Sequence, residues 1–233
     1  MIFTKLILAH LLGDFLFQPN SWVADKEKKK EKSIYLYLHV LIHFALTFIF
    51  LWDIKLWWIA AIVAVTHFFA DWAKLSLQNP KTKRTWFFVD QLLHIAVIAG
   101  VSFWYFPNFY FTDIFTEPVL RILTGALFLT IPSSIIIKTL ITIWTPNPTE
   151  KTNIQTESLA NAGKYIGILE RLLVFVFIIV NHWEGVGFMI AAKSVFRFSD
   201  LAEAKQRKLT EYVLIGTLLS FGIAILTGIL VKL

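Results

Sequence analysis

Five of the six histidines in this sequence lie within its first hundred residues, and each has a histidine or an aspartate four residues away. This spacing puts two side chains on the same face of a helix, one turn apart. It also lets one helix offer two ligands to a metal ion, as in H-E-x-x-H zinc sites. The four pairs are His10 with Asp14, His39 with His43, His67 with Asp71, and Asp90 with His94. The pattern predicts a metal centre.

The donor types narrow the choice of metal. Five imidazoles and three carboxylates, in a chain without cysteine, suit zinc first, with manganese or iron as alternatives. The set is too rich in nitrogen for calcium or magnesium. Eight donors predict two divalent ions, with Asp71 or Asp90 free to act as a catalytic general base instead of a ligand. The alternative is that the four pairs are structural and join helices by hydrogen bonds.

Each pair lies in a different apolar stretch of about membrane-spanning length. Of the 233 residues 57% are hydrophobic and 16% charged, against about 25% charged in soluble domains. Backbone groups in lipid must be satisfied internally, so we expect helices. The predicted fold is an all-α, polytopic transmembrane helical bundle of seven or eight segments. The segments run roughly over 2–18, 34–52, 56–77, 86–106, 119–144, 165–180, 187–198 and 212–231. The seventh is short and contains Lys193, so it is either a crossing helix or a re-entrant one.

Lysine and arginine gather in alternate connections between these segments. They occur around 26–32, 81–84, 151–164 and 197–208, whereas the connections between are poor in them. By the positive-inside rule, the N-terminus is predicted to lie outside and the basic connections in the cytoplasm. The same rule explains the net charge of +6 without a nucleic-acid partner. All four pairs then fall in the cytoplasmic third of the membrane, where an antiparallel bundle can point them at one centre.

The chain divides, on sequence, into an N-terminal bundle over 1–145 that carries the His/Asp pairs and a C-terminal portion over 146–233. A second polar cluster lies in that C-terminal portion. It predicts either an anion clamp for a phosphate or a set of intramembrane ion pairs, and the two readings are evenly matched. The candidate substrate-binding residues are Lys74, Arg171, Lys193 and Arg197. The residues expected to support the ligands or the substrate are Gln18, Gln91, Glu170, Glu211 and Tyr212.

At these residues the sequence resembles the bacterial membrane-protein family of domain of unknown function 3307. The matching pieces are AHLLGDFLFQP at 9–19, HVLIH at 39–43, THFFADWAK at 66–74 and DQLLH at 90–94. The C-terminal pieces AAKSVFRF at 191–198 and EYVLIGTLLSF at 211–221 look like those of longer members. That resemblance carries no settled activity. The pairs are also similar in ligand type, though not in motif, to the LexA-regulated membrane proteins predicted to be metal-dependent hydrolases.

These features together predict a metal-dependent membrane hydrolase that acts on a phosphorylated lipid or another membrane-associated phosphate ester at the cytoplasmic leaflet. Bound metal ions would activate a water molecule and stabilise charge on the phosphate oxygens. One alternative is a transporter of divalent metal ions or protons that uses the same residues. A second alternative is a membrane scaffold or sensor with a cytoplasmic protein partner, in which the pairs are structural. The bilayer is the expected partner in every case.

Overall fold

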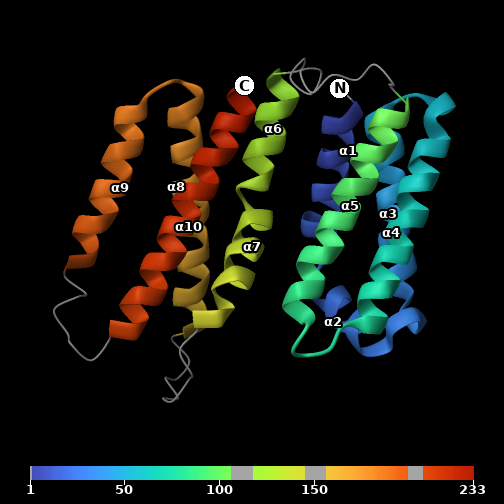
Figure 1. Cartoon of the computed structure of the whole chain (residues 1–233), viewed down its shortest axis with the longest axis horizontal. Coiled ribbons are helices and arrows are strands. Elements are labelled where there is room, and N and C mark those ends of the chain that lie inside the picture. The colour runs from blue at the N-terminus through green and yellow to red at the C-terminus, as the bar shows by residue number, and fades with distance from the viewer. Residues whose placement is uncertain (1, 106–117, 145–155, 199–206) are drawn as a thin grey trace. The chain divides into compact units, whose positions relative to one another are not determined.

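The computed structural model describes residues 2–105, 118–144, 156–198 and 207–233, and all regular elements within these ranges are helices (Figure 1). The prediction of an all-α fold is therefore confirmed. The chain divides into two compact units, Met1–Thr124 and Gly125–Leu233. The sequence predicted a boundary after residue 145, whereas the boundary between the two units falls within α6. The reason is that α7 packs against α8 and α10 of the second unit. The connections over 106–117, 145–155 and 199–206 lie outside the described residues.

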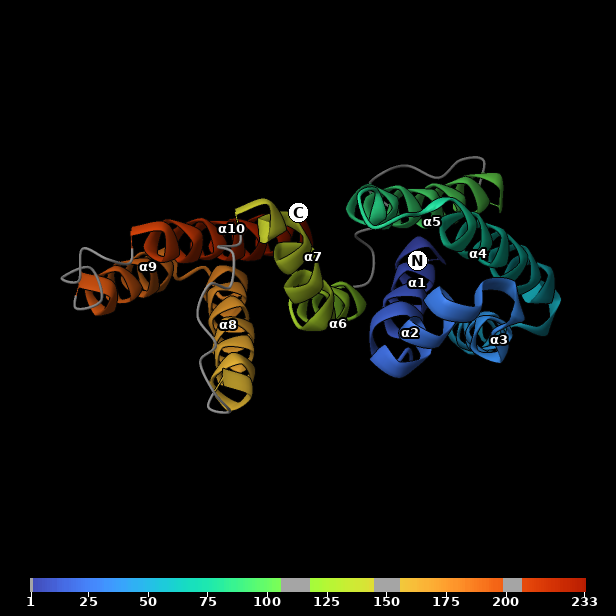
Figure 2. The same cartoon turned by 90° about the horizontal axis from the view of Figure 1, so that it is seen from below.

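The first unit is a closed ring of four long elements. The first of these combines α1 with a π-helical turn, η1. It contacts both α3 and α5, while α4 joins α3 to α5 (Figure 2). The elements of the ring are α1 Ile2–Leu11, η1 Leu12–Leu16, α3 Ile34–Leu51, α4 Trp57–Leu77 and α5 Lys83–Tyr105. Short connections make sequential helices antiparallel, so residues far apart in the chain share one level of the bundle.

One end of the ring is filled by an apolar core. The core consists of Leu6, Leu51, Leu56, Ile59, Val63, Ile98 and Val101. These residues precede the His/Asp pairs on α1 and α4 and follow them on α3 and α5, so the core lies on a single side of the pairs. Buried side chains of this kind give about 25 cal/mol per Å² removed from water, but between helices in lipid, packing contacts contribute instead.

The other end of the ring is crossed by a short polar helix, α2 (Asn20–Lys29) (Figure 1). Pro19 stands at its N-cap, where a proline cannot continue the preceding helix. The ring of Trp22 stacks on that of Tyr35 with centroids 5.0 Å apart. The Ser33 hydroxyl donates to the Asp25 carboxylate over 2.6 Å. These contacts fix α2 to the start of α3.

The second unit has its own apolar core and a broken helix. Its core is built around Leu129, Val174, Phe175, Ile178 and Phe221. The helices α6 and α7 meet at a bend of 41°. The bend occurs at Thr130, just before Pro132, since proline lacks the N–H that a continuous helix would use. The helices are α6 Pro118–Phe128, α7 Ile131–Ile141, α8 Thr156–Ile179, α9 Trp183–Phe198 and α10 Arg207–Lys232, with η5 at Thr142–Trp144.

Each of the eight apolar segments predicted from the sequence corresponds to a helix or to a pair of consecutive helices. Among the described residues, four helices are long and apolar enough to cross a bilayer, or five if the bent pair α6–α7 counts as one span. These four to five candidate spans are what a helical membrane protein would have. The count of seven or eight segments and the outside position of the N-terminus stay predictions.

Candidate metal centre

The four predicted pairs meet in the middle of the first unit. The five histidines, Asp71 and Asp90 are each at most 4% exposed, although all are polar. Asp14 is the eighth member, and its side chain is 10% exposed. The ring of His67 stacks on that of His43 with centroids 3.8 Å apart, and on that of His94 with centroids 3.9 Å apart. The expectation that an antiparallel bundle would gather these pairs is confirmed by their geometry.

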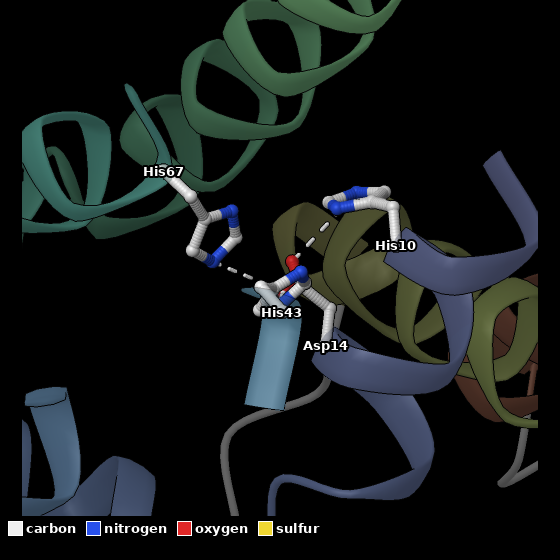
Figure 3. A group of neighbouring side chains, drawn as sticks. All are labelled: His10, Asp14, His43 and His67. Atoms are coloured by element: carbon white, nitrogen blue, oxygen red, sulfur yellow. Dashed lines mark hydrogen bonds and ion pairs between the residues drawn. The ribbon is translucent and has the colours of Figure 1, made fainter. Parts of the chain in front are cut away.

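Asp14 lies at the heart of this cluster. Its Oδ1 atom is 2.9 Å from Nε2 of His43, 3.3 Å from Nε2 of His39 and 3.4 Å from Nε2 of His67. Its Oδ2 atom is 3.8 Å from Nε2 of His10. Figure 3 shows the rings of His10, His43 and His67 turned towards this carboxylate from three different helices. A single carboxylate is thereby surrounded by four imidazoles.

The spacing of these atoms fits the coordination of a metal ion. A zinc ion about 2.1 Å from four tetrahedral ligands holds the ligand atoms roughly 3.4 Å apart. Three sets of donors in the described chain have all their ligand atoms within 4.8 Å of one another. The sets are His10, Asp14, His43 and His67; His39, His67 and Asp71; and Asp14, Asp90 and His94. Because the sets share Asp14 and His67, ions bound in neighbouring sets would share ligands.

Two buried atoms at one edge of the cluster lack hydrogen bonds. Oδ1 of Asp90 and Nε2 of His94 lie 3.2 Å apart, yet neither makes a hydrogen bond of acceptable geometry. Nδ1 of His39 is buried without a partner as well. Leaving a buried polar group unpaired costs about 1–3 kcal/mol, so such groups are uncommon in a well-packed core. A cation between Asp90 and His94 would satisfy both.

Local backbone features bring Asp14 into position. The last turns of the first membrane segment widen into η1, a π-helical turn that contains Asp14. Such turns are rare and occur frequently at functional sites. The preceding residue is Gly13, and a Cβ atom there would lie 2.5 Å from Cε1 and Nε2 of His43. Only a glycine therefore lets α3 bring His43 against the Asp14 carboxylate.

Of the two supporting residues predicted in the first unit, Gln91 lies beside the cluster. Gln91 Nε2 donates to Asp14 Oδ2 over 2.9 Å, and Gln91 Oε1 lies 3.3 Å from Nε2 of His10. Gln91 thus bridges two donors and orients them, as partners of metal ligands do. Gln18 follows η1 by two residues, and its buried Nε2 has no hydrogen-bond partner.

Two lysines contact the carboxylates at the cluster's edge. Lys74, predicted as a substrate contact, donates from Nζ to Oδ2 of Asp90 over 2.7 Å. Lys26 on α2 donates from Nζ to Oδ2 of Asp71 over 2.6 Å and is only 5% exposed. The sequence analysis counted Lys26 only among the basic residues of a connection. The one local signal for its burial is that it lies four residues after Trp22, on the face of α2 that packs against α3.

The predicted residues of the second polar cluster lie in the second unit. Lys193 on α9 forms an ion pair with Glu170 on α8. Glu211 is exposed and Tyr212 is partly buried at the start of α10. The side chain of Arg197 lies outside the part of the structure that is described.

The guanidinium of Arg171 makes four hydrogen bonds within the second unit. It donates to the carbonyls of Leu129 and Thr130 and to the hydroxyls of Ser134 and Ser220. The first three acceptors lie at the α6–α7 break, and Ser220 lies on α10. Arg171 therefore joins the break to α8 and α10 and stabilises the second unit.

The family described as protein of unknown function (DUF3307) matches residues 2–120. The chain belongs to this family. The matched part of DUF3307 comprises α1 to α5 and therefore contains every donor of the cluster, together with Gly13, Lys26, Lys74 and Gln91. No curated protein and no solved structure matches the chain. The match to DUF3307 ends at residue 120, so the C-terminal motifs at 191–198 and 211–221 lie beyond it.

Proposed function

We propose that this protein is a metal-dependent hydrolase of the bacterial inner membrane, which cleaves a phosphate ester of a lipid or another membrane-associated molecule at the cytoplasmic leaflet. In this proposal the chain crosses the membrane seven or eight times with its N-terminus outside. Two divalent ions, zinc in the first place, are held by His10, Asp14, His39, His43, His67, Asp71, Asp90 and His94.

One observation carries the proposal: a buried ammonium group, Lys26, and a partly buried one, Lys74, contact the carboxylates among the metal donors. Three carboxylates and the two ammoniums of Lys26 and Lys74 leave one net negative charge if the imidazoles are neutral. Two divalent cations would turn this into three net positive charges. Such a centre needs an anionic ligand to balance it, because buried charge without a partner is costly. A phosphate ester supplies that charge, whereas a site that only carries cations gains nothing from nearby ammoniums.

The packing around the centre also favours an enzyme over a channel. The core around Leu6, Ile59 and Ile98 closes one side of the His/Asp cluster with apolar side chains. The opposite side bears the polar helix α2 and the two lysines. An ion leaving through the apolar side would lose its hydration without gaining ligands. The centre thus suits a substrate that arrives and leaves on the same side.

The chemistry follows from the donor set. Divalent ions in such a centre supply a water molecule that is acidic near neutral pH and stabilise charge on phosphoryl oxygens. Asp71 or Asp90 accepts the proton of the attacking water, since each has an oxygen at the edge of the cluster. The water oxygen would bond to phosphorus as the ester P–O bond breaks, and the alcohol would leave with the proton that the carboxylate had accepted from the water. Gln91 holds Asp14 in place throughout.

The test combines metal content with activity in the detergent-purified full chain. Elemental analysis should find about two transition-metal ions per chain. A His39→Ala, Asp71→Ala double variant should lose them, whereas His182→Ala should keep them, because His182 is exposed in the second unit. The metal-loaded protein should release phosphate or alcohol from some member of a broad panel of phospholipids and lipid phosphates. Tight metal binding with no hydrolysis across that panel would reject the proposal.

The transporter remains the second candidate because η1 interrupts the regular helix inside the first segment. Transport sites often lie beside broken helices. Uptake of zinc or manganese into proteoliposomes, lost in an Asp14→Asn variant, would favour this function over hydrolysis. A chain without bound metal, even after reconstitution with zinc and manganese, would instead favour the scaffold or sensor.

A further inference from the structure

Lys26 differs in burial from the other lysines of α2 and of the turn that follows. Lys28, Lys29 and Lys30 are exposed at the end of α2 and in the turn that follows, as expected for a polar helix at a membrane surface. Lys26 instead points into the bundle, with its side chain 6% exposed and its Nζ on Asp71. Removing an ammonium from water costs several kcal/mol, so the position requires a compensating role.

Lys26 and Lys74 approach the same group of donors from two elements. Asp71 and Lys74 are three residues apart on α4 and therefore share a face of that helix. Asp71 also interacts electrostatically with both ammoniums. Each lysine bonds to one oxygen of a carboxylate that also faces an imidazole of the metal donor sets: His39 beside Asp71 and His94 beside Asp90. Both ammoniums consequently stand at the edge of the positions that metal ions would take.

Asp14 makes the contrast clear. Its oxygens face His39, His43 and His67 on one side and Gln91 on the other, and the contacts that the structure gives it include no lysine. Both ammoniums therefore hydrogen-bond at Asp71 and Asp90, although Lys74 also feels the charge of Asp14. A metal ion on an Asp71 or Asp90 oxygen would leave the adjacent ammonium free to contact an anion.

We infer that Lys26 and Lys74 form a subsite for the dianionic terminal phosphate of a phosphate monoester, with Lys26 brought into the bundle by α2. The inference rests on the proposed hydrolase function and narrows its substrate class. A monoester phosphate carries up to two charges and three terminal oxygens. It can contact metal ions with some oxygens and still offer one to an ammonium. A phosphodiester has a single charge and two free oxygens, so it cannot satisfy metal ions and both lysines at once.

The surface before α2 suits a substrate anchored in lipid. Leu16 and Phe17 are 50% and 47% exposed, next to the start of the helix that carries Lys26. Apolar side chains beside a polar helix place that helix at the level of the lipid headgroups. A phosphate at the headgroup level could then reach the two ammoniums from the bilayer. A free phosphate or a soluble monoester is the other source of the same chemistry.

The experiment measures binding of inorganic phosphate and of dimethyl phosphate to the metal-loaded full chain by calorimetry. Inorganic phosphate should bind the unaltered protein, and dimethyl phosphate should bind about tenfold more weakly or worse. Lys26→Met should weaken phosphate binding by about tenfold or more, with its metal content unchanged. Lys26→Arg should retain binding within a few-fold, and the exposed Lys28→Met should match the unaltered protein.

Two further measurements distinguish a phosphate on a lipid headgroup from a soluble one. Phosphatidic acid in mixed micelles should displace bound inorganic phosphate if the ligand is a lipid headgroup, while glycerol phosphate alone should do so if it is soluble. Unchanged phosphate affinity in a metal-replete Lys26→Met variant overturns the inference, as does loss of metal from that variant. A protein that binds phosphate through Lys26 but hydrolyses no ester would retain this subsite and reject the hydrolase.

Discussion

The two units of the chain both bury charged side chains, but they treat them differently. In the described part of the second unit, the partly buried Glu170 pairs with Lys193, and the buried Arg171 donates to three oxygen atoms at the α6–α7 break and to one on α10. In the first unit one carboxylate is shared by four imidazoles, and buried atoms of Asp90 and His94 have no hydrogen bond. Burial of charge alone therefore does not identify a site. An excess of ligands around unsatisfied atoms does.

The largest effect should come from the carboxylate at the centre of the first unit. Asp14→Asn removes the charge on an oxygen that three Nε2 atoms approach within 3.4 Å. We expect nearly all bound metal to be lost, as measured by elemental analysis of the purified chain. The counterpart in the second unit, Glu170→Gln, should leave the metal content unchanged. Equal loss of metal from both variants would contradict the assignment of the metal centre to the first unit.

The second largest effect should appear in the second unit. Arg171→Met removes the donors to two carbonyls and two hydroxyls, so buried acceptors lose their partners. We expect a loss of roughly 3 kcal/mol of stability. Thermal unfolding in detergent, followed by circular dichroism, measures this change. Metal bound by the first unit should be retained, and a variant of normal stability would show that the break does not need the guanidinium.

A smaller effect should follow from one added methyl group beside the centre. Gly13→Ala places a Cβ 2.5 Å from the ring of His43, so the ring must move away from Asp14. Overpacking of this kind costs about 1–3 kcal/mol, and displacement of a ligand weakens metal binding by about 10–100-fold. Metal competition with a chelator measures the affinity. The control is Gly100→Ala on α5, where a Cβ meets nothing within 4 Å and metal affinity should not change.

The smallest effect concerns the exposed ion pair on α2, near the buried Lys26. Hydrogen bonds from the Lys29 ammonium, and then from the Ser33 hydroxyl, hold the pKa of Asp25 below its usual value. A carboxyl group with a lowered pKa in the folded state stabilises the fold above its unfolded pKa. That contribution disappears as the pH falls through the folded pKa.

Lys29→Met should therefore raise the pKa of Asp25 towards the ordinary value, as read from the pH titration of its carboxyl carbon resonance. Because exposed pairs contribute little, the unfolding temperature at neutral pH should not change. A large change would mean that the surface of α2 matters as much as its buried lysine.

Much of the first unit could be predicted from the sequence, since its signals are local. Apolar segments of about membrane length give the helices, and the i, i+4 spacing gives the shared face of each His/Asp pair. The basic connections predict the depth of each pair in the membrane, and antiparallel helices then place the four pairs at the same depth. The sequence therefore singled out the eight side chains that the structure brings together, and also Gln91 and Lys74 beside them.

Other features depend on contacts between residues far apart in the chain. The burial of Lys26 depends on Asp71, which lies on another helix, and the requirement for Gly13 depends on how closely α3 approaches. The partners of Arg171 lie at the α6–α7 break and on α10, far from Arg171 in the sequence. Periodicity within one helix states which side chains share a face, but the atom that meets each side chain lies on a neighbouring helix. The sequence by itself thus determined the helices and the His/Asp pairs. Tertiary packing decided which lysine and glycine lie against those pairs, and which oxygen atoms accept hydrogen bonds from Arg171.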